Sequence, residues 1–242
     1  MSEILSLERM NIGSHFRAYS LRGAYNTTNP FIGVDHAWMS GPTFPPHPHQ
    51  GFSAVSYLFL DSETGINNRD SIGTKNLIKP GGLHWTTAGQ GIVHEEVPAE
   101  TGKTVHSLQI FINLPSHLRE TAPGYLILEA EDVPIVHREG VKVRVPLGHF
   151  ENVQSPLTPP TEVTMLDISF EPNAELILTL APEHSGFLLP VYGEVSVDDQ
   201  TFKLDDLHVP IFKAKEVTQY ISLKALERGA KLVFFSAKPL SN

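Results

Sequence analysis

The 242-residue chain has no cysteine at all. Disulfide frameworks, cysteine-ligated zinc sites, iron–sulfur clusters and thiol nucleophiles are therefore excluded, because each requires a thiol or thiolate. Long apolar runs are also lacking, and none approaches the roughly 20 residues that span a bilayer. The first twenty residues contain no apolar segment of the signal-peptide type. We therefore expect a cytoplasmic protein that does not associate with membranes.

Basic residues are few, with 18 Lys and Arg against 27 Asp and Glu, and the formal net charge is −9. A nucleic-acid surface requires clustered Lys and Arg that neutralise phosphates. The basic residues of this chain are instead dispersed along the sequence. Direct nucleic-acid binding is therefore not expected.

Proline and glycine, by contrast, are abundant, with 19 and 18 residues. They separate short runs of Val, Ile, Leu, Phe and Thr, a pattern typical of many short strands joined by turns. The sequence therefore predicts an all-β fold. The expected strands are residues 53–60, 75–78, 84–87, 91–95, 107–113, 141–145, 163–170, 175–180, 186–192, 194–197, 217–223 and 231–235. Short helices are expected at 116–121 and 223–228.

The chain divides near residue 130, where prolines and an acidic cluster at 129–132 interrupt the strand pattern. Both halves contain strand–turn–strand segments of similar character, which predicts two β-barrels, residues 1–130 and 131–242. The second half has no His-x-His or His-x-Glu pair. We therefore expect a metal only in the first barrel, and a structural, lid or interface role for the second.

The most specific motif is His47-Pro48-His49, followed at a distance by His94-Glu95-Glu96. Residues i and i+2 of a strand point to the same face, about 6.6–7 Å apart. His47 and His49 can thus converge on one point, as can His94 and Glu96, whereas Glu95 points away. The spacing predicts a metal site formed by His47, His49, His94 and Glu96.

Three imidazoles and one carboxylate suit Fe, Mn, Co, Ni, Cu or Zn. On an octahedral metal such a set leaves two positions open for water, dioxygen or a chelating substrate. Glu96 is also a candidate general base for a substrate hydroxyl.

Residues next to these motifs are candidates for contacting a substrate: Gln50, Phe52, Trp85 and Gln90. For Trp85 the alternative is a plain core residue, and for the two glutamines a solvated position at the barrel mouth. His84 is expected to lie behind the ligands or at the surface rather than to act as a fifth ligand.

These residues resemble the cupin superfamily. Its first motif, glycine, five residues and His-x-His, is matched by Gly41, His47 and His49. Its second, Pro-x-Gly ahead of a histidine, is matched by Pro80, Gly82 and His94.

Several blocks between about residues 30 and 115 are similar to the pirin family in particular. They are Pro30-Phe31 with Asp35-His36, the segment 47–52, Arg69-Asp70-Ser71-Ile72-Gly73, the segment 85–96, and Asn113-Leu114-Pro115.

The resemblance implies a bicupin fold whose N-terminal barrel holds one divalent metal, with iron(II) favoured, on His47, His49, His94 and Glu96. Some pirins resemble flavonol 2,4-dioxygenases that cleave quercetin with O₂. Others are metal-dependent partners of transcription regulators or metabolic enzymes. The family also favours a monomer.

Three positions depart from the usual family pattern: Gln50 and Gln90 replace arginines, and Ser53 replaces a glutamate. Loss of two positive charges weakens attraction for an anionic substrate. The leading hypothesis is a non-haem metal dioxygenase acting on a flavonol or related enol. The alternative is an iron-dependent regulatory protein that binds a transcription factor or metabolic enzyme.

Overall fold

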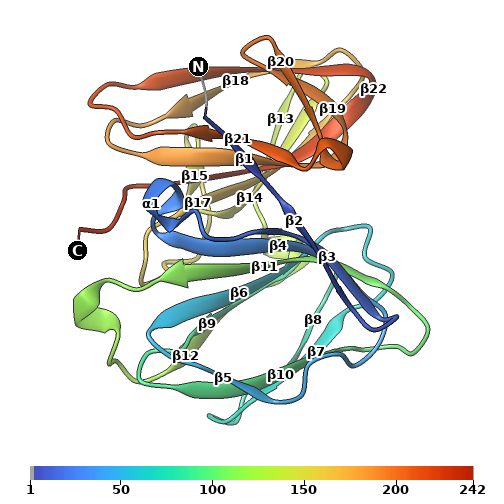
Figure 1. The fold of residues 1–242 in the computed structure, drawn as a ribbon, viewed down its shortest axis with the longest axis vertical. Coiled ribbons are helices and arrows are strands. Elements are labelled where there is room, and N and C mark those ends of the chain that lie inside the picture. Colours follow the sequence, from blue (N-terminus) through green and yellow to red (C-terminus); the bar gives the residue numbers. More distant parts are fainter. Residues whose placement is uncertain (1–2, 242) are drawn as a thin grey trace.

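The computed structural model describes residues 3–241 and is built almost entirely from strands, which confirms the all-β prediction. The helical segments are short: α1 (Tyr25–Thr28), η1 (Ser116–Leu118), η2 (Ala130–Asp132) and η3 (Leu204–Asp206). None of the helices in residues 3–241 is long and apolar enough to cross a membrane. Figure 1 shows the strands stacked in two layered bodies, one above the other.

Two sheets make up the lower body in Figure 1. The seven-stranded sheet has the order β12-β9-β6-β11-β4-β3-β2, and the four-stranded sheet has the order β5-β10-β7-β8. The bounds are β2 (Glu8–Ile12), β3 (Phe16–Leu21), β4 (Phe31–Met39), β6 (Phe52–Leu58), β9 (Leu83–Thr87), β11 (Val105–Asn113) and β12 (Gly124–Leu128), with β5 (His47–His49), β7 (Ile66–Asp70), β8 (Lys75–Ile78) and β10 (Ile92–Pro98) opposite.

The upper body is one nine-stranded sheet whose main path is β1-β21-β19-β22-β17-β14-β13, with β18 on β22 and β20 on β19. A separate hairpin pairs β15 with β16. The bounds are β1 (Glu3–Ser6), β13 (Ile135–Arg138), β14 (Val141–Leu147), β15 (His149–Phe150), β16 (Val153–Gln154), β17 (Thr164–Phe170), β18 (Glu175–Leu180), β19 (Ser185–Val197), β20 (Gln200–Lys203), β21 (His208–Phe212) and β22 (Gln219–Ala237).

The two bodies repeat the same pairing scheme. In the first, β6 lies between β9 and β11, and β10 pairs with β5 and β7. In the second, β19 begins between β21 and β22, and the first part of β22 pairs with β18 and the end of β19. The shared pairing scheme is consistent with the internal repeat that the sequence predicted, and the two bodies are called the first and the second barrel below.

The N-terminal strand β1 departs from the repeat, because it belongs to the first half of the chain but pairs with a strand of the second body. Strand β12 pairs with β9 and covers one edge of the first barrel, whereas the equivalent edge of the second is covered by β1, which pairs with β21. Figure 1 shows the blue N-terminal strand crossing to the orange body. Strand pairing otherwise follows the two halves of the chain, and the division at residue 130 stays a prediction.

The expected helix at 223–228 is wrong, because β22 runs without interruption from Gln219 to Ala237. Ala225 pairs with Val195, and Leu223 pairs with Leu176 on the other side. This non-local pairing overrides the helix propensity of the local sequence. The expected helix at 116–121 is only the single turn η1. Expected strands 186–192 and 194–197 merge into β19 through irregular pairing, and 217–223 and 231–235 merge into β22.

The largest core cluster lies between the two barrels. Strand alternation sends Val55 and Tyr57 of β6 to this cluster, where they meet Phe187, Val233 and other residues of the second barrel. A second cluster, including Leu178 and Phe234, fills the second barrel. The cluster inside the first barrel is small. The first barrel therefore has room for polar side chains that the second lacks.

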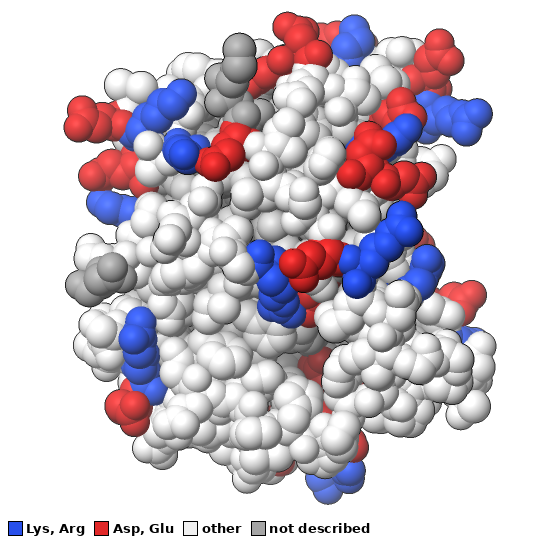
Figure 2. Space-filling view, in the orientation of Figure 1, with Lys and Arg blue, Asp and Glu red and all other residues white. Residues whose placement is uncertain are grey.

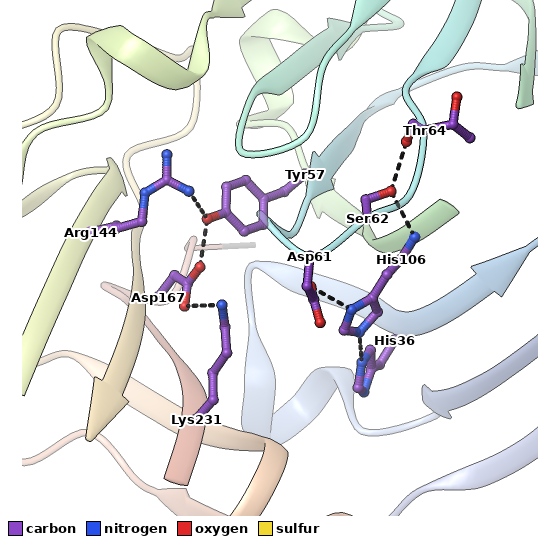
Figure 3. A network of polar contacts seen from close by, with 9 residues as sticks. All are labelled: His36, Tyr57, Asp61, Ser62, Thr64, His106, Arg144, Asp167 and Lys231. Atoms are coloured by element: carbon purple, nitrogen blue, oxygen red, sulfur yellow. Dashed lines mark hydrogen bonds and ion pairs between the residues drawn. The ribbon is translucent and has the colours of Figure 1, made fainter. Parts of the chain in front are cut away.

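A buried polar network also joins the barrels (Figure 3). The Tyr57 hydroxyl donates to Asp167 at 2.7 Å and accepts from Arg144 at 3.0 Å. Lys231 lies 3.1 Å from the other oxygen of Asp167. Tyr57 comes from the first barrel and the three charged groups from the second. These buried contacts between the halves favour one relative placement of the two halves.

Charged side chains of both signs are interspersed on the face in Figure 2, mostly over the upper body and the waist. A continuous basic stripe, as phosphate backbones require, is not seen on this face among the described residues.

Candidate metal centre

Strand register brings the three predicted histidines together. Strand β5 pairs with β10 so that His94 lies directly opposite His47, and Ile92 lies opposite His49. Directly opposed residues share a face, and so do residues two apart along a strand. Pro48 is tolerated between the two histidines because β5 is an edge strand, where a missing N–H breaks no ladder.

The nitrogens of His47, His49 and His94 lie within 4.8 Å of one another. The Nε2 atoms of His49 and His94 are 2.9 Å apart. Two metal–nitrogen bonds of about 2.1 Å at a right angle separate their nitrogens by about 3.0 Å. The spacing of this pair therefore fits adjacent ligands of one ion.

The protonation of the triad also suits a metal. Burial, with repulsion from the neighbouring imidazoles, lowers the pKa of His49 to about 4 and that of His94 to about 4. Both rings are therefore neutral at pH 7, and a neutral imidazole has the lone pair that ligation requires. His47 Nδ1 donates to the Pro45 carbonyl at 3.0 Å, which leaves its Nε2 as the free lone pair.

His94 has a carboxylate on its other side. Asp70 lies directly opposite it on β7 and favours its protonated form electrostatically. Asp70 Oδ1 accepts from the backbone N–H groups of Ile72 and Thr74, whereas Oδ2 is buried without a partner, as is His94 Nδ1. A carboxylate that accepts from the second nitrogen of a ligating histidine fixes its tautomer and raises its basicity, and Asp70 Oδ2 and His94 Nδ1 are the two atoms free to form such a bond. The donor set therefore fits a divalent metal.

Glu96 lies on the same face of β10 as His94 but is not part of the close triad. Both of its carboxylate oxygens are 2.8 Å from the Ser56 hydroxyl. Burial raises its pKa, while the Ser56 hydrogen bond acts in the opposite direction. Glu95 points to the other face, where Arg69 donates to it at 2.6 Å. Only Glu96 is thus placed inside the barrel.

Aromatic rings border the triad. Phe52 lies 5.2 Å from His49 and 5.8 Å from Phe111, measured between ring centroids. Phe111 itself lies 6.0 Å from His49, and the Arg22 guanidinium carbon lies over the Phe111 ring, 4.6 Å from its centroid. Phe52 is therefore well placed to contact a ligand, and Phe111 joins it.

Gln50 and Gln90 are exposed and lie on neighbouring turns, since Gly51 N–H donates to the Gly89 carbonyl at 2.8 Å. Both amides are therefore open to solvent, and contact with a substrate stays a prediction for them.

Trp85 does not reach the site. Its side chain is fully buried in the cluster between the barrels, and its indole N–H donates to Thr87 Oγ1 at 3.2 Å. Its neighbour His84 takes the inner face, where it lies close enough to His94 and Glu96 for their charges to affect its pKa. Alternation along β9 thus makes His84, not Trp85, the inward-facing residue.

Four polar or aromatic residues near the ligands were missed by sequence reasoning: Ser56, Asp70, Gln109 and Phe111. Strand parity was the available signal for all of them, because each lies on the inner face of a strand. Which strands adjoin β5 and β10 could not be read from local sequence.

The equivalent strand pair in the second barrel is aliphatic. Its inward-facing cross-strand pairs include Leu176 with Leu223 and Leu178 with Ile221. These side chains carry no ligand atom, so the two barrels differ in chemistry although they share pairing topology.

Comparison with known proteins gives a consistent picture. The Pirin family model matches residues 6–112. Pirin of Homo sapiens is 30% identical over 212 residues, which cover 86% of this chain and 72% of that protein. The chain spans about half the length of two pirin-like proteins of Arabidopsis thaliana that it also matches, 54% and 52%.

Solved structures agree in fold. The crystal structure of quercetin 2,3-dioxygenase from Acinetobacter baumannii superposes with a TM-score of 0.85 at 26% identity, covering 99% of this chain and 87% of that one. The bacterial pirin YhhW of Escherichia coli, solved in complex with nickel(II), gives a TM-score of 0.76 at 16% identity and covers 99% and 100%. At that identity the second likeness concerns the fold alone.

Proposed function

This chain belongs to the pirin family, and we propose that it is a metal-dependent dioxygenase that cleaves a flavonol or a related enol-containing compound with O₂. The observation that carries the proposal is the triad of imidazoles on β5 and β10, with the Glu96 carboxylate on the same face of β10 as His94. The likeness to a quercetin dioxygenase supports this substrate class.

His47, His49 and His94 would hold one divalent metal, with Glu96 as the fourth ligand. Such an ion, with open coordination positions, brings a chelating substrate and O₂ together and lowers the pKa of a bound hydroxyl. Iron(II) is the favoured metal, although the ligand types also suit Mn, Co, Ni, Cu and Zn.

Glu96 would also leave the metal briefly and take the proton from the substrate hydroxyl. Burial raises its pKa above that of an ordinary carboxyl, which brings its proton affinity closer to that of an enol or phenol. The proton moves from the hydroxyl oxygen to one carboxylate oxygen, and Ser56 can still donate to the other.

Phe52 and Phe111 would orient the substrate rings, because both lie beside His49. Gln50 and Gln90 would meet the substrate at the mouth with neutral amides. We therefore expect less dependence of KM on ionic strength than two arginines at these positions would give.

Elemental analysis of the purified protein, paired with O₂ uptake on adding quercetin, tests the proposal. One transition metal per chain, with rapid uptake that is abolished in Glu96→Gln, would support it. Bound metal without uptake on quercetin or other enols would contradict the dioxygenase assignment and favour the metal-dependent regulatory alternative. Absence of metal after reconstitution with iron(II) would contradict both.

A further inference from the structure

A row of polar side chains crosses the inner face of the seven-stranded sheet behind Glu96. Cross-strand register places Gln109 opposite Ser56, and Ser56 opposite His84. The row continues on β4, where Asp35 lies opposite Gln109. Ser56 and His84 are buried, at 3% and 1% exposure, so their polar atoms have left water.

The second barrel shows that this polarity is not a requirement of the fold. Its equivalent strands β17, β22 and β19 place Leu166, Phe234 and Leu188 in one row across the inner face. An apolar row therefore closes the same architecture. Burial of polar groups costs desolvation free energy unless they are hydrogen-bonded. Since the fold itself does not require polar residues in this row, their presence in the first barrel points to a role in the site.

The geometry around Ser56 supplies that reason. Its Oγ is 2.8 Å from each Glu96 oxygen and 3.0 Å from Gln109 Oε1. A serine hydroxyl has only one hydrogen to donate. If that hydrogen goes to Glu96, Gln109 completes the chain by turning its amide so that Nε2 donates to Ser56 Oγ, an orientation of nearly identical shape.

We propose that Ser56, oriented by Gln109, is a positioning residue that fixes the Glu96 carboxylate for metal ligation and proton transfer. The proposal rests on the proposed function of the same site. A glutamate has three side-chain torsions, and its carboxylate is free to swing unless something holds it. Because both oxygens lie 2.8 Å from Ser56 Oγ, either one can accept the hydroxyl hydrogen and leave the other for a second partner.

Cobalt(II) titration of the purified protein, followed by visible absorption, tests the positioning role without any need for turnover. Loss of a hydrogen-bond partner behind a metal ligand typically weakens metal affinity by about 10–100-fold. We expect Ser56→Ala to weaken cobalt(II) binding within that range and to change the absorption spectrum. Ser56→Thr, which keeps the hydroxyl, should restore both. Gln109→Leu should give a smaller loss in the same direction.

The matched control is Ser107→Ala. Ser107 is also a buried serine on the inner face of this sheet, two residues from Gln109, but it makes no hydrogen bond to Glu96. The Ser107→Ala variant should bind cobalt(II) with the same affinity as the unaltered protein. If quercetin turnover is measurable, kcat should fall in Ser56→Ala with little change in KM.

Unchanged or tighter cobalt(II) binding in Ser56→Ala would overturn the positioning role, and so would an equal loss in Ser107→Ala. A misfolded Ser56→Ala would leave the decision to Ser56→Thr and Gln109→Leu. The cobalt(II) results stand even if quercetin is not turned over, so failure of the positioning role is distinguishable from failure of the proposed function.

Discussion

Neighbouring side chains of a strand point to opposite faces of the sheet, and the adjacent glutamates of β10 show the consequence most clearly. Glu96 faces the barrel interior and Ser56, whereas Glu95 faces Arg69 on the outside. The two carboxylates have the same chemistry, so only their direction distinguishes them. The same alternation separates His84 from Trp85 on β9.

The glutamate pair gives a matched test at two adjacent positions of one strand. Glu96→Gln should lower metal affinity by about 10–100-fold, because a charged ligand becomes a neutral amide. Glu95→Gln should leave metal content unchanged and remove only an exposed ion pair of about 0–1 kcal/mol. Metal content after dialysis would measure both, and loss in Glu95→Gln alone would contradict the assigned strand faces.

Strand β6 makes polar side-chain contacts on both faces of its sheet. Ser56 points to Glu96 inside the first barrel, and Tyr57 points to Asp167 and Arg144 in the second. Anchoring one face of the strand limits movement of the other. The second barrel can therefore support the site although its equivalent positions carry no ligand atoms.

Removal of the Tyr57 hydroxyl tests how much its contacts with the second barrel contribute to stability. Tyr57→Phe keeps the ring but leaves Asp167 and Arg144 with one buried partner fewer, and we expect a loss of about 1–3 kcal/mol in the free energy of unfolding. Denaturant unfolding would measure it. Tyr125→Phe is the control, since Tyr125 is 49% exposed and should change stability by less than about 0.5 kcal/mol. Equal effects would show that Tyr57 makes no special contribution.

A second feature at the scale of elements is the pairing of β1, from the first half of the chain, with β21 of the second barrel. Removal of residues 1–6 would leave β21 without its partner on that edge. Amide hydrogen exchange in β21 should then accelerate, while β9, covered by β12, should keep its protection. Unchanged exchange in β21 would mean that β1 contributes little to the second barrel.

At the scale of the whole molecule, the barrels are joined through the largest core cluster and the Tyr57 network. Figure 3 shows a second polar group beside this network, formed by residues of the first barrel alone. His106 Nδ1 donates to Asp61 at 2.9 Å, and His36 lies 2.7 Å from His106 between their Nε2 atoms. This assigns His36 as donor to His106 and leaves His36 Nδ1 buried without a partner.

This histidine pair should make stability depend on pH. Burial, followed by the charges of His106, Arg17 and Lys231, lowers the pKa of His36 well below 6.5. The unfolded state therefore binds more protons below about pH 6.5, and stability falls as pH decreases from 7 toward the lowered value. His36→Gln should reduce this slope by up to about 1.4 kcal/mol per pH unit. Urea unfolding between pH 5 and 8 measures it, and an unchanged slope would count against a neutral His36.

The sequence alone determined the fold class, the strand-rich halves and the three histidines, because these depend on local properties. Turn residues, β-branched runs and the two-residue period of a strand act over a few positions, and they are visible in any window of the chain. Strands 75–78 and 175–180 were predicted to the residue for this reason. Glu96 was likewise separated from Glu95 by parity alone.

Only the tertiary structure decided what depends on partners distant in the chain. The segment 223–228 is a strand because β18 and β19 supply hydrogen bonds that no local pattern reveals. Trp85 faces the second barrel because a sheet has two buried faces here, and alternation cannot say which one surrounds a metal. Ser56 meets both Glu96 and Gln109 only because three strands far apart in sequence enclose one interior. The candidate ligands are thus recognisable from local sequence, whereas the residues that support them depend on strand pairing over long sequence distances.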